Sequence, residues 1–179
     1  MSNTVQTDPG LTLEENAKRA ARSLMALHAA AGFTPTALYT YRDAIGRPHF
    51  WIVRMDHPKI GEKIIRPMNL AGDEYSLGLP PFPVEGSPLY HLDRLATDPS
   101  SPVWFVEGEK CARSLAAKGL LAVTSCGGAQ SGHRADLRPL AGRAVILWRD
   151  NDPGALNYAY SPPRPPGGPP RAGMRRRGA

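Results

Sequence analysis

Two apolar runs, each followed closely by acidic residues, constrain the fold of this 179-residue chain more than any other feature. The first run spans residues 103–106 and precedes Glu107, and the second spans residues 144–148 and precedes Asp150 and Asp152. Continuous apolar runs are typical of strands buried on both faces of a parallel sheet. Because ligands bind beyond the carboxyl ends of such strands, we expect the three carboxylates to share one rim. Their mutual repulsion there favours a bound cation, and oxygen ligands suit Mg²⁺.

The segment between the two runs has the elements that a parallel connection needs. Residues 110–118 have a helical pattern that ends at Gly119, and residues 121–124 form a second short apolar run. A tight loop at residues 126–129 follows, and residues 136–140 suggest a short helix before the last run. Parallel strands require a crossover of this kind, usually an α-helix. We therefore predict strand, helix, strand and strand in this order.

This arrangement resembles the TOPRIM domain, which bacterial-type primases, topoisomerases and some nucleases share. The family pattern is a strand ending in Glu-Gly, a helix, a second strand, and a third strand ending in Asp-x-Asp. The corresponding residues here are Glu107-Gly108 and Asp150-Asn151-Asp152. The segments are most similar to the TOPRIM modules of phage and plasmid primases and primase-helicases, firmly over residues 103–159 and more weakly over residues 38–95.

The resemblance implies an α/β fold: a partial Rossmann-like TOPRIM core with a parallel sheet, preceded by an N-terminal helix and a small antiparallel sheet. It places the helix and small sheet in residues 11–98 and the incomplete core in residues 99–160. It implies that Asp150 and Asp152 bind Mg²⁺, with Mn²⁺ as an alternative ion. It also implies that Glu107 binds metal or acts as general acid or base at the 3′-hydroxyl of a nucleotide.

Five further residues receive roles from the same resemblance. Gly108 would let the backbone approach phosphates. Glu109 would support the metal cluster by contacting its ligands without binding the metal itself. Lys110 would meet a phosphate as a point charge, or is an ordinary exposed lysine on the first helical turn. Gly127 and Gly128 would admit a phosphate, or form a plain turn.

The function implied by the resemblance is primer synthesis by Mg²⁺-dependent nucleotidyl transfer on single-stranded DNA, in replication of a phage, plasmid or integrated element. Its partners would be single-stranded DNA, nucleotides and a replicative helicase. Two alternatives stay open. One is a TOPRIM nuclease, which uses the same metal chemistry in reverse. The other is an inactive, truncated remnant that acts at most as a DNA-binding module.

The N-terminal half predicts a helix followed by antiparallel strands. Thr12 and Glu15 fit a capping box that starts a helix, which we expect to end near Ala31. Residues 38–55 have the β-branched and aromatic composition of a hairpin, residues 63–66 suggest a third strand, and residues 72–88 are expected to connect to the core. The hairpin aromatics either stack nucleobases, or half of them form the core face of the sheet: Tyr39, Tyr41, Phe50 and Trp51.

Both ends of the chain have the composition of disordered segments. Residues 1–10 are polar, and residues 161–179 hold six Pro, five Arg and four Gly. This tail begins where the resemblance predicts a further helix and strand, which suggests a truncated gene or a frameshift. The tail also carries most of the net charge of +6. Bulk charge is therefore weak evidence for a nucleic-acid partner.

The remaining composition indicates a cytoplasmic protein without a zinc site. The two cysteines, Cys111 and Cys126, do not form a Cys-x-x-Cys pair, and His91 and His133 do not complete a zinc-binding spacing. No run of apolar residues approaches the length of a membrane span, and acidic residues interrupt the N-terminus early. We expect neither zinc nor a membrane as a partner.

Overall fold

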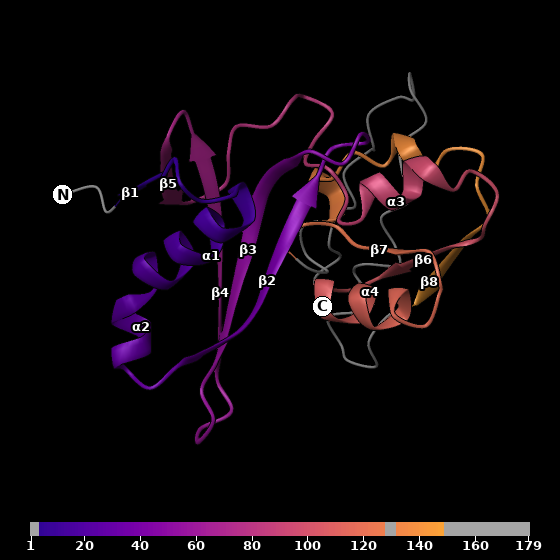
Figure 1. Cartoon of the computed structure of the whole chain (residues 1–179). Coiled ribbons are helices and arrows are strands. Elements are labelled where there is room, and N and C mark those ends of the chain that lie inside the picture. The colour runs from indigo at the N-terminus through magenta and orange to yellow at the C-terminus, as the bar shows by residue number, and fades with distance from the viewer. Residues whose placement is uncertain (1–3, 128–131, 149–179) are drawn as a thin grey trace, which may run out of the picture.

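The computed structural model of the chain describes residues 4–127 and 132–148. It is a mixed α/β structure with a five-stranded antiparallel sheet and a three-stranded parallel sheet, which lie side by side in Figure 1. The coarse fold class expected from the sequence is therefore confirmed. The antiparallel sheet has the order β1-β5-β4-β3-β2, with β1 (Thr4–Gln6), β2 (Thr34–Arg42), β3 (Pro48–Asp56), β4 (Lys63–Ala71) and β5 (Glu74–Leu77).

The N-terminal helix begins where the sequence predicts but ends earlier. In α1 (Leu13–Leu24), the Thr12 hydroxyl accepts from the backbone N–H of Glu15, and the Glu15 carboxylate accepts from the backbone N–H of Thr12 at 2.9 Å. The capping box is thus confirmed. The continuous helix expected to Ala31 is interrupted at Met25, and α2 (Ala26–Ala30) follows. Met25 leaves the helical conformation with its side chain fully buried in the core against the sheet.

Two expectations about the N-terminal half are wrong in detail. Residues 4–6, expected to be disordered, form β1, and residues 74–77 of the expected connecting segment form β5. The two strands pair antiparallel, with Val5 opposite Tyr75, so each satisfies backbone groups of the other. The antiparallel sheet is consequently larger than the hairpin and third strand that the sequence indicates.

The aromatic residues of the hairpin are core residues. Tyr39 and Tyr41 lie opposite Ile52 and Phe50 in the β2–β3 register, and this face packs against the parallel sheet and α4. Trp51 points to the other face, where α1 covers it (Figure 1). All four aromatic side chains are buried. The alternative in which they stack nucleobases is therefore wrong, because both faces of the sheet are covered.

The parallel sheet has β6 at its centre and the order β7-β6-β8. Its elements are β6 (Val103–Val106), α4 (Glu109–Ala116), β7 (Ala122–Val123) and β8 (Val145–Trp148). Phe105 lies opposite Val123 on one side and Leu147 on the other, and both pairings are parallel. The strand–helix–strand–strand order predicted from the sequence is confirmed.

Shorter elements flank the parallel sheet. Residues 89–91 lead into α3 (Leu92–Thr97), and the short helix expected at residues 136–140 is the 3₁₀ turn η2 (Arg138–Leu140). A second 3₁₀ turn, η1 (Gly132–Arg134), precedes it. The Val103 and Phe105 side chains pack with buried residues of this region, such as Leu89 and Leu95.

The two apolar runs that define the sheet differ in burial. Val103, Phe105 and Val106 of β6 are buried, as expected for a central parallel strand. In β8, by contrast, Val145 to Trp148 are between 37% and 57% exposed. The expectation that both strands are buried on both faces is therefore wrong for β8. Among the described residues β8 pairs with β6 only, so it forms an edge of the sheet.

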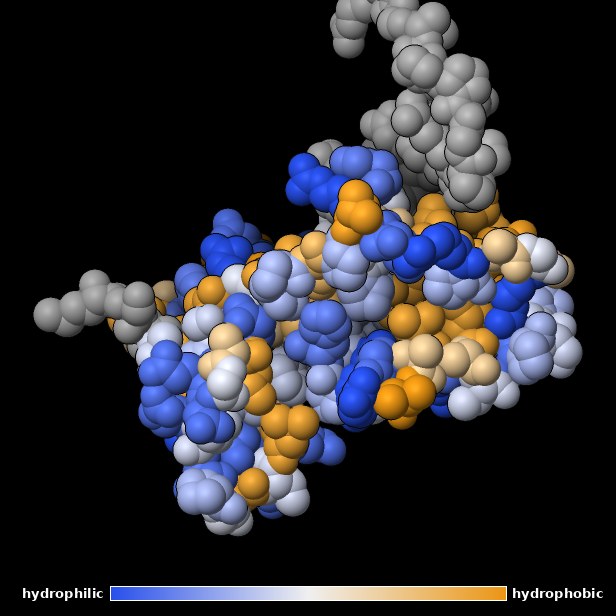
Figure 2. Space-filling model, turned by 90° about the horizontal axis from the view of Figure 1, so that it is seen from above, coloured by the Kyte–Doolittle hydropathy of each residue, from blue (hydrophilic) through white to orange (hydrophobic). Residues whose placement is uncertain are grey.

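The exposed apolar side chains of β8 contribute to the molecular surface. Figure 2 shows more hydrophobic surface on the side that carries the parallel sheet than on the side that carries α1 and α2.

Within residues 4–127 and 132–148, no helix has the length and apolar character required to cross a bilayer.

Candidate functional site

The carboxyl ends of the three parallel strands form the rim where the sequence predicts a site. Glu107 follows the central strand β6, and residues 124–127 follow β7. Val106 lies opposite Trp148 in the β6–β8 register, so both strands reach the rim at the same level. Ligands of open parallel sheets bind at such an edge.

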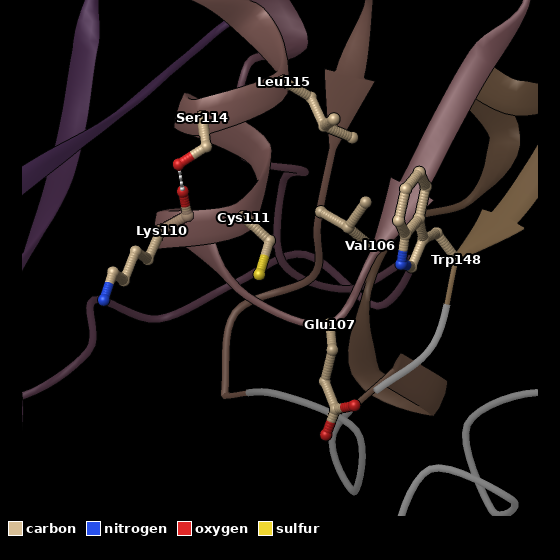
Figure 3. Close-up of a pocket in the computed structure, with 7 residues that line it drawn as sticks. All are labelled: Val106, Glu107, Lys110, Cys111, Ser114, Leu115 and Trp148. Carbon is tan, nitrogen blue, oxygen red and sulfur yellow. Dashed lines mark hydrogen bonds between the residues drawn. The ribbon is translucent and has the colours of Figure 1, made fainter. Parts of the chain in front are cut away.

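Glu107 stands at the mouth of a groove on this rim. The groove has a volume of about 330 Å³ and lies between α4 and the end of β8. Glu107 is partly buried, and Figure 3 shows its carboxylate pointing away from the side chains of Lys110 and Ser114. The predicted catalytic residue thus lies at the centre of the rim with its carboxylate directed outward.

Gly108 leaves open space next to Glu107. It caps α4 with an extended backbone (φ −158°), which any residue adopts. A Cβ built on Gly108 meets no atom of the described residues within 4 Å. Neither backbone strain nor packing against the described residues therefore requires glycine here, and the approach of a phosphate to this backbone stays a prediction.

Glu109 connects α4 to the antiparallel sheet. The Tyr41 hydroxyl of β2 donates a hydrogen bond to Glu109 Oε1 at 2.7 Å. Tyr41 is fully buried, and this burial and the Glu109 carboxylate raise the pKa of its hydroxyl well above the usual value. Burial raises the pKa of the neighbouring Cys126 thiol to about 12, with Glu109 as the second cause. The residue expected to support the metal cluster therefore ties α4 to the antiparallel sheet.

Basic side chains extend along the exposed surface of α4. Lys110 is exposed, and in Figure 3 its ammonium group points away from the Glu107 carboxylate. One turn later, the guanidinium of Arg113 lies 5.2 Å from the centroid of the Tyr39 ring. An exposed Lys110 fits both roles that the sequence left open, phosphate contact and an ordinary surface lysine, and its role therefore stays a prediction.

Of the four other predicted site residues, the structure describes only Gly127. Gly127 is exposed and has φ +90°, the left-handed conformation that glycine adopts readily in a turn. Gly128, Asp150 and Asp152 lie outside the described residues. The structure therefore brings Glu107, Gly108 and Lys110 to one end of α4.

The predicted donor set consists of carboxylate oxygens, which fits a hard cation such as Mg²⁺. Within the described ranges, His, Cys, Asp and Glu side chains form no group of three or more that could hold a metal ion. Two of the three predicted ligands, Asp150 and Asp152, are outside those ranges.

Sequence reasoning missed two features of this region. One is Tyr41, whose partner Glu109 is 68 positions away in the sequence. The other is Trp148, which lines the groove with Val106, Cys111 and Leu115. The available signal was its position, an aromatic residue at the last place of a strand and two residues before Asp150.

Replacing Tyr41 with Phe tests the link between α4 and the antiparallel sheet. Tyr41→Phe removes only the hydroxyl, and hydrogen bonds to charged groups stabilise proteins by about 1.5–3 kcal/mol. We expect urea unfolding to show a loss of that size. Tyr75→Phe is the matched control, because the buried Tyr75 hydroxyl donates only a long bond (3.4 Å) to the neutral carbonyl of Leu13. Equal losses in both variants would contradict a special role for Glu109.

No family model, curated protein or solved structure matches this chain.

Proposed function

We propose that the rim at the carboxyl ends of β6 and β8 is a TOPRIM-type site for Mg²⁺-dependent nucleotidyl transfer on single-stranded DNA, as in primer synthesis. One observation carries the proposal. Glu107 directly follows the central parallel strand, whose last residue lies opposite Trp148 of β8. In the sequence, Asp150 and Asp152 follow Trp148 by two and four positions. The resemblance predicts this order of acids on two adjacent parallel strands.

The residues of the site have complementary roles in the proposal. Asp150 and Asp152, with Glu107, would hold the metal, which would neutralise charge that develops on the transferred phosphoryl group. Glu107 would also accept the proton of the attacking 3′-hydroxyl. Lys110 and Arg113 are exposed on α4, where they would attract the phosphates of nucleotides and DNA.

A binding module without catalysis is the second candidate, and the exposure of β8 favours it. The side chains of Val145 to Trp148 are well exposed, although the strand carries the chain to the two predicted metal ligands. A site that lacks a packed supporting shell holds its metal loosely. The proposed enzyme therefore requires that the carboxylates bind Mg²⁺ in the folded chain.

Calorimetric titration of the full-length protein with Mg²⁺ tests this requirement. We expect binding in the wild type and no measurable binding in Asp150→Ala/Asp152→Ala. The matched control is Asp73→Ala/Glu74→Ala, which removes two acidic residues at the β4–β5 turn and the start of β5 and should leave Mg²⁺ binding intact. A folded wild type that does not bind Mg²⁺, or equal binding in both double variants, would overturn the proposed site in favour of the binding module.

A further inference from the structure

The groove between α4 and β8 is built differently at its two ends. Val106, Leu115 and Trp148 supply apolar surface along the groove, whereas Glu107 and Lys110 lie at its outer end (Figure 3). Its volume of about 330 Å³ is at the lower end of the range for small-molecule sites. A ligand that combines an apolar part with a charged part would match both ends.

Trp148 offers an aromatic surface in this groove. Its ring centroid lies 5.4 Å from that of Trp104, with the planes tilted by 50°, so Trp104 supports the indole. Trp148 nevertheless remains 53% exposed. Side chains alternate along a strand, so Trp148 faces α4, while Leu147, 57% exposed, faces the opposite side of the sheet. A supported but accessible indole is a stacking platform for a planar ligand.

We propose that this groove binds the base of the nucleotide substrate, which stacks on the Trp148 indole with its phosphates directed toward the Glu107–Lys110 end. Base–aromatic stacking tolerates any base, as a polymerase that copies different template residues requires. The direction of the phosphates depends on the proposed function. The stacking itself requires neither the metal nor the three acids.

Charge complementarity favours a nucleotide over an apolar peptide or a second copy of the chain. Lys110, the basic side chain that lines the groove, is exposed. Lysine is a flexible point charge that rotates to meet a phosphate. An apolar strand added to the edge of β8 would use Leu147 as much as Trp148, because edge pairing places side chains on both faces of the sheet. The two residues therefore distinguish the occupants.

Tryptophan fluorescence of the full-length protein tests the proposal with three probes in the absence of metal. We expect ATP and adenosine to quench the emission, because both carry a base, and tripolyphosphate to leave it unchanged. In Trp148→Leu, the quenching should disappear and the Kd for ATP, measured by calorimetry, should rise about tenfold or more. Trp148→Phe should retain most of the affinity. Leu147→Ala, equally exposed on the other face, should bind ATP like the wild type.

Several results would overturn the proposal. One is ATP affinity that is unchanged in Trp148→Leu, and another is the absence of ATP binding in the wild type. A third is sedimentation that shows a dimer weakened by both Trp148→Leu and Leu147→Ala, because the edge of β8 would then bind a second copy. The proposed function is tested separately. Adenosine binding without Mg²⁺ binding would support the base subsite and contradict the enzyme. Mg²⁺ binding together with unchanged ATP affinity in Trp148→Leu would support the metal site and contradict the base subsite.

Discussion

Replacing Glu107 with Gln is expected to abolish primer synthesis by the full-length protein. The substitution keeps the shape of the side chain but removes its charge and its ability to accept a proton. General acid–base catalysis alone contributes about 100- to 10,000-fold to a rate, so we expect a loss of at least about 100-fold. The measurement is incorporation of labelled ribonucleotides and deoxynucleotides on a single-stranded DNA template, with Mg²⁺ and separately with Mn²⁺.

A matched control separates this effect from a change in overall charge. Glu62→Gln alters an exposed carboxylate in the connection between β3 and β4, and should leave incorporation unchanged. Unchanged incorporation in Glu107→Gln would show that Glu107 is not catalytic. Degradation of labelled single-stranded DNA by the wild type, without nucleotide incorporation, would identify the nuclease alternative. That activity should also require Glu107, because the same carboxylates would hold the metal.

Gly86→Ala is expected to cause the largest loss of stability among the single substitutions considered. Gly86 has φ +117°, and a Cβ built on it would lie 2.3 Å from the Arg134 carbonyl oxygen and 2.8 Å from the Ala135 carbonyl carbon. These are backbone atoms, which cannot rotate away as a side chain does. Backbone strain and overpacking each cost about 1–3 kcal/mol, so we expect a loss of about 3 kcal/mol in urea unfolding.

The contact at Gly86 positions the segment that leads into the parallel sheet. The Ser87 N–H donates to the Arg134 carbonyl, and the Asp136 N–H donates to the Ser87 carbonyl, both at 2.8 Å. Gly46→Ala is the matched control, because Gly46 has φ +86° but open space around its Cβ position. It should lose only the cost of the backbone conformation, about 1–2 kcal/mol. Equal losses in the two variants would contradict the close approach of residues 86 and 134.

The site was predictable only where its residues are close in the sequence. Glu107, Gly108 and Lys110 lie at the start of α4 as expected, because a strand, its following turn and the first helical turn are set by neighbouring residues. The environment of Glu109 was not predictable. Its partner Tyr41 belongs to strand β2 of the antiparallel sheet, and no local pattern encodes a bond between residues that far apart.

The fold shows the same division between local and distant information. Local patterns predicted the capping box of α1, the hairpin strands β2 and β3, and the parallel order of the core, because helix caps and strand composition depend on a few adjacent residues. They did not predict β1 and β5, since a three-residue strand such as β1 carries almost no signal of its own and forms only when its partner is in place.

Burial was decided by the tertiary structure. The sequence identified Tyr39, Tyr41, Phe50 and Trp51 as strand residues but left open whether they form the core or a base-stacking surface. Packing against α1 on one face and against α4 and the parallel sheet on the other makes them core residues. The apolar composition of β6 and β8 predicted strands correctly, yet only β6 is buried, because it is central and β8 lies at the edge of the described sheet. Composition sets which residues favour burial, and the docking of distant elements determines which of them are buried.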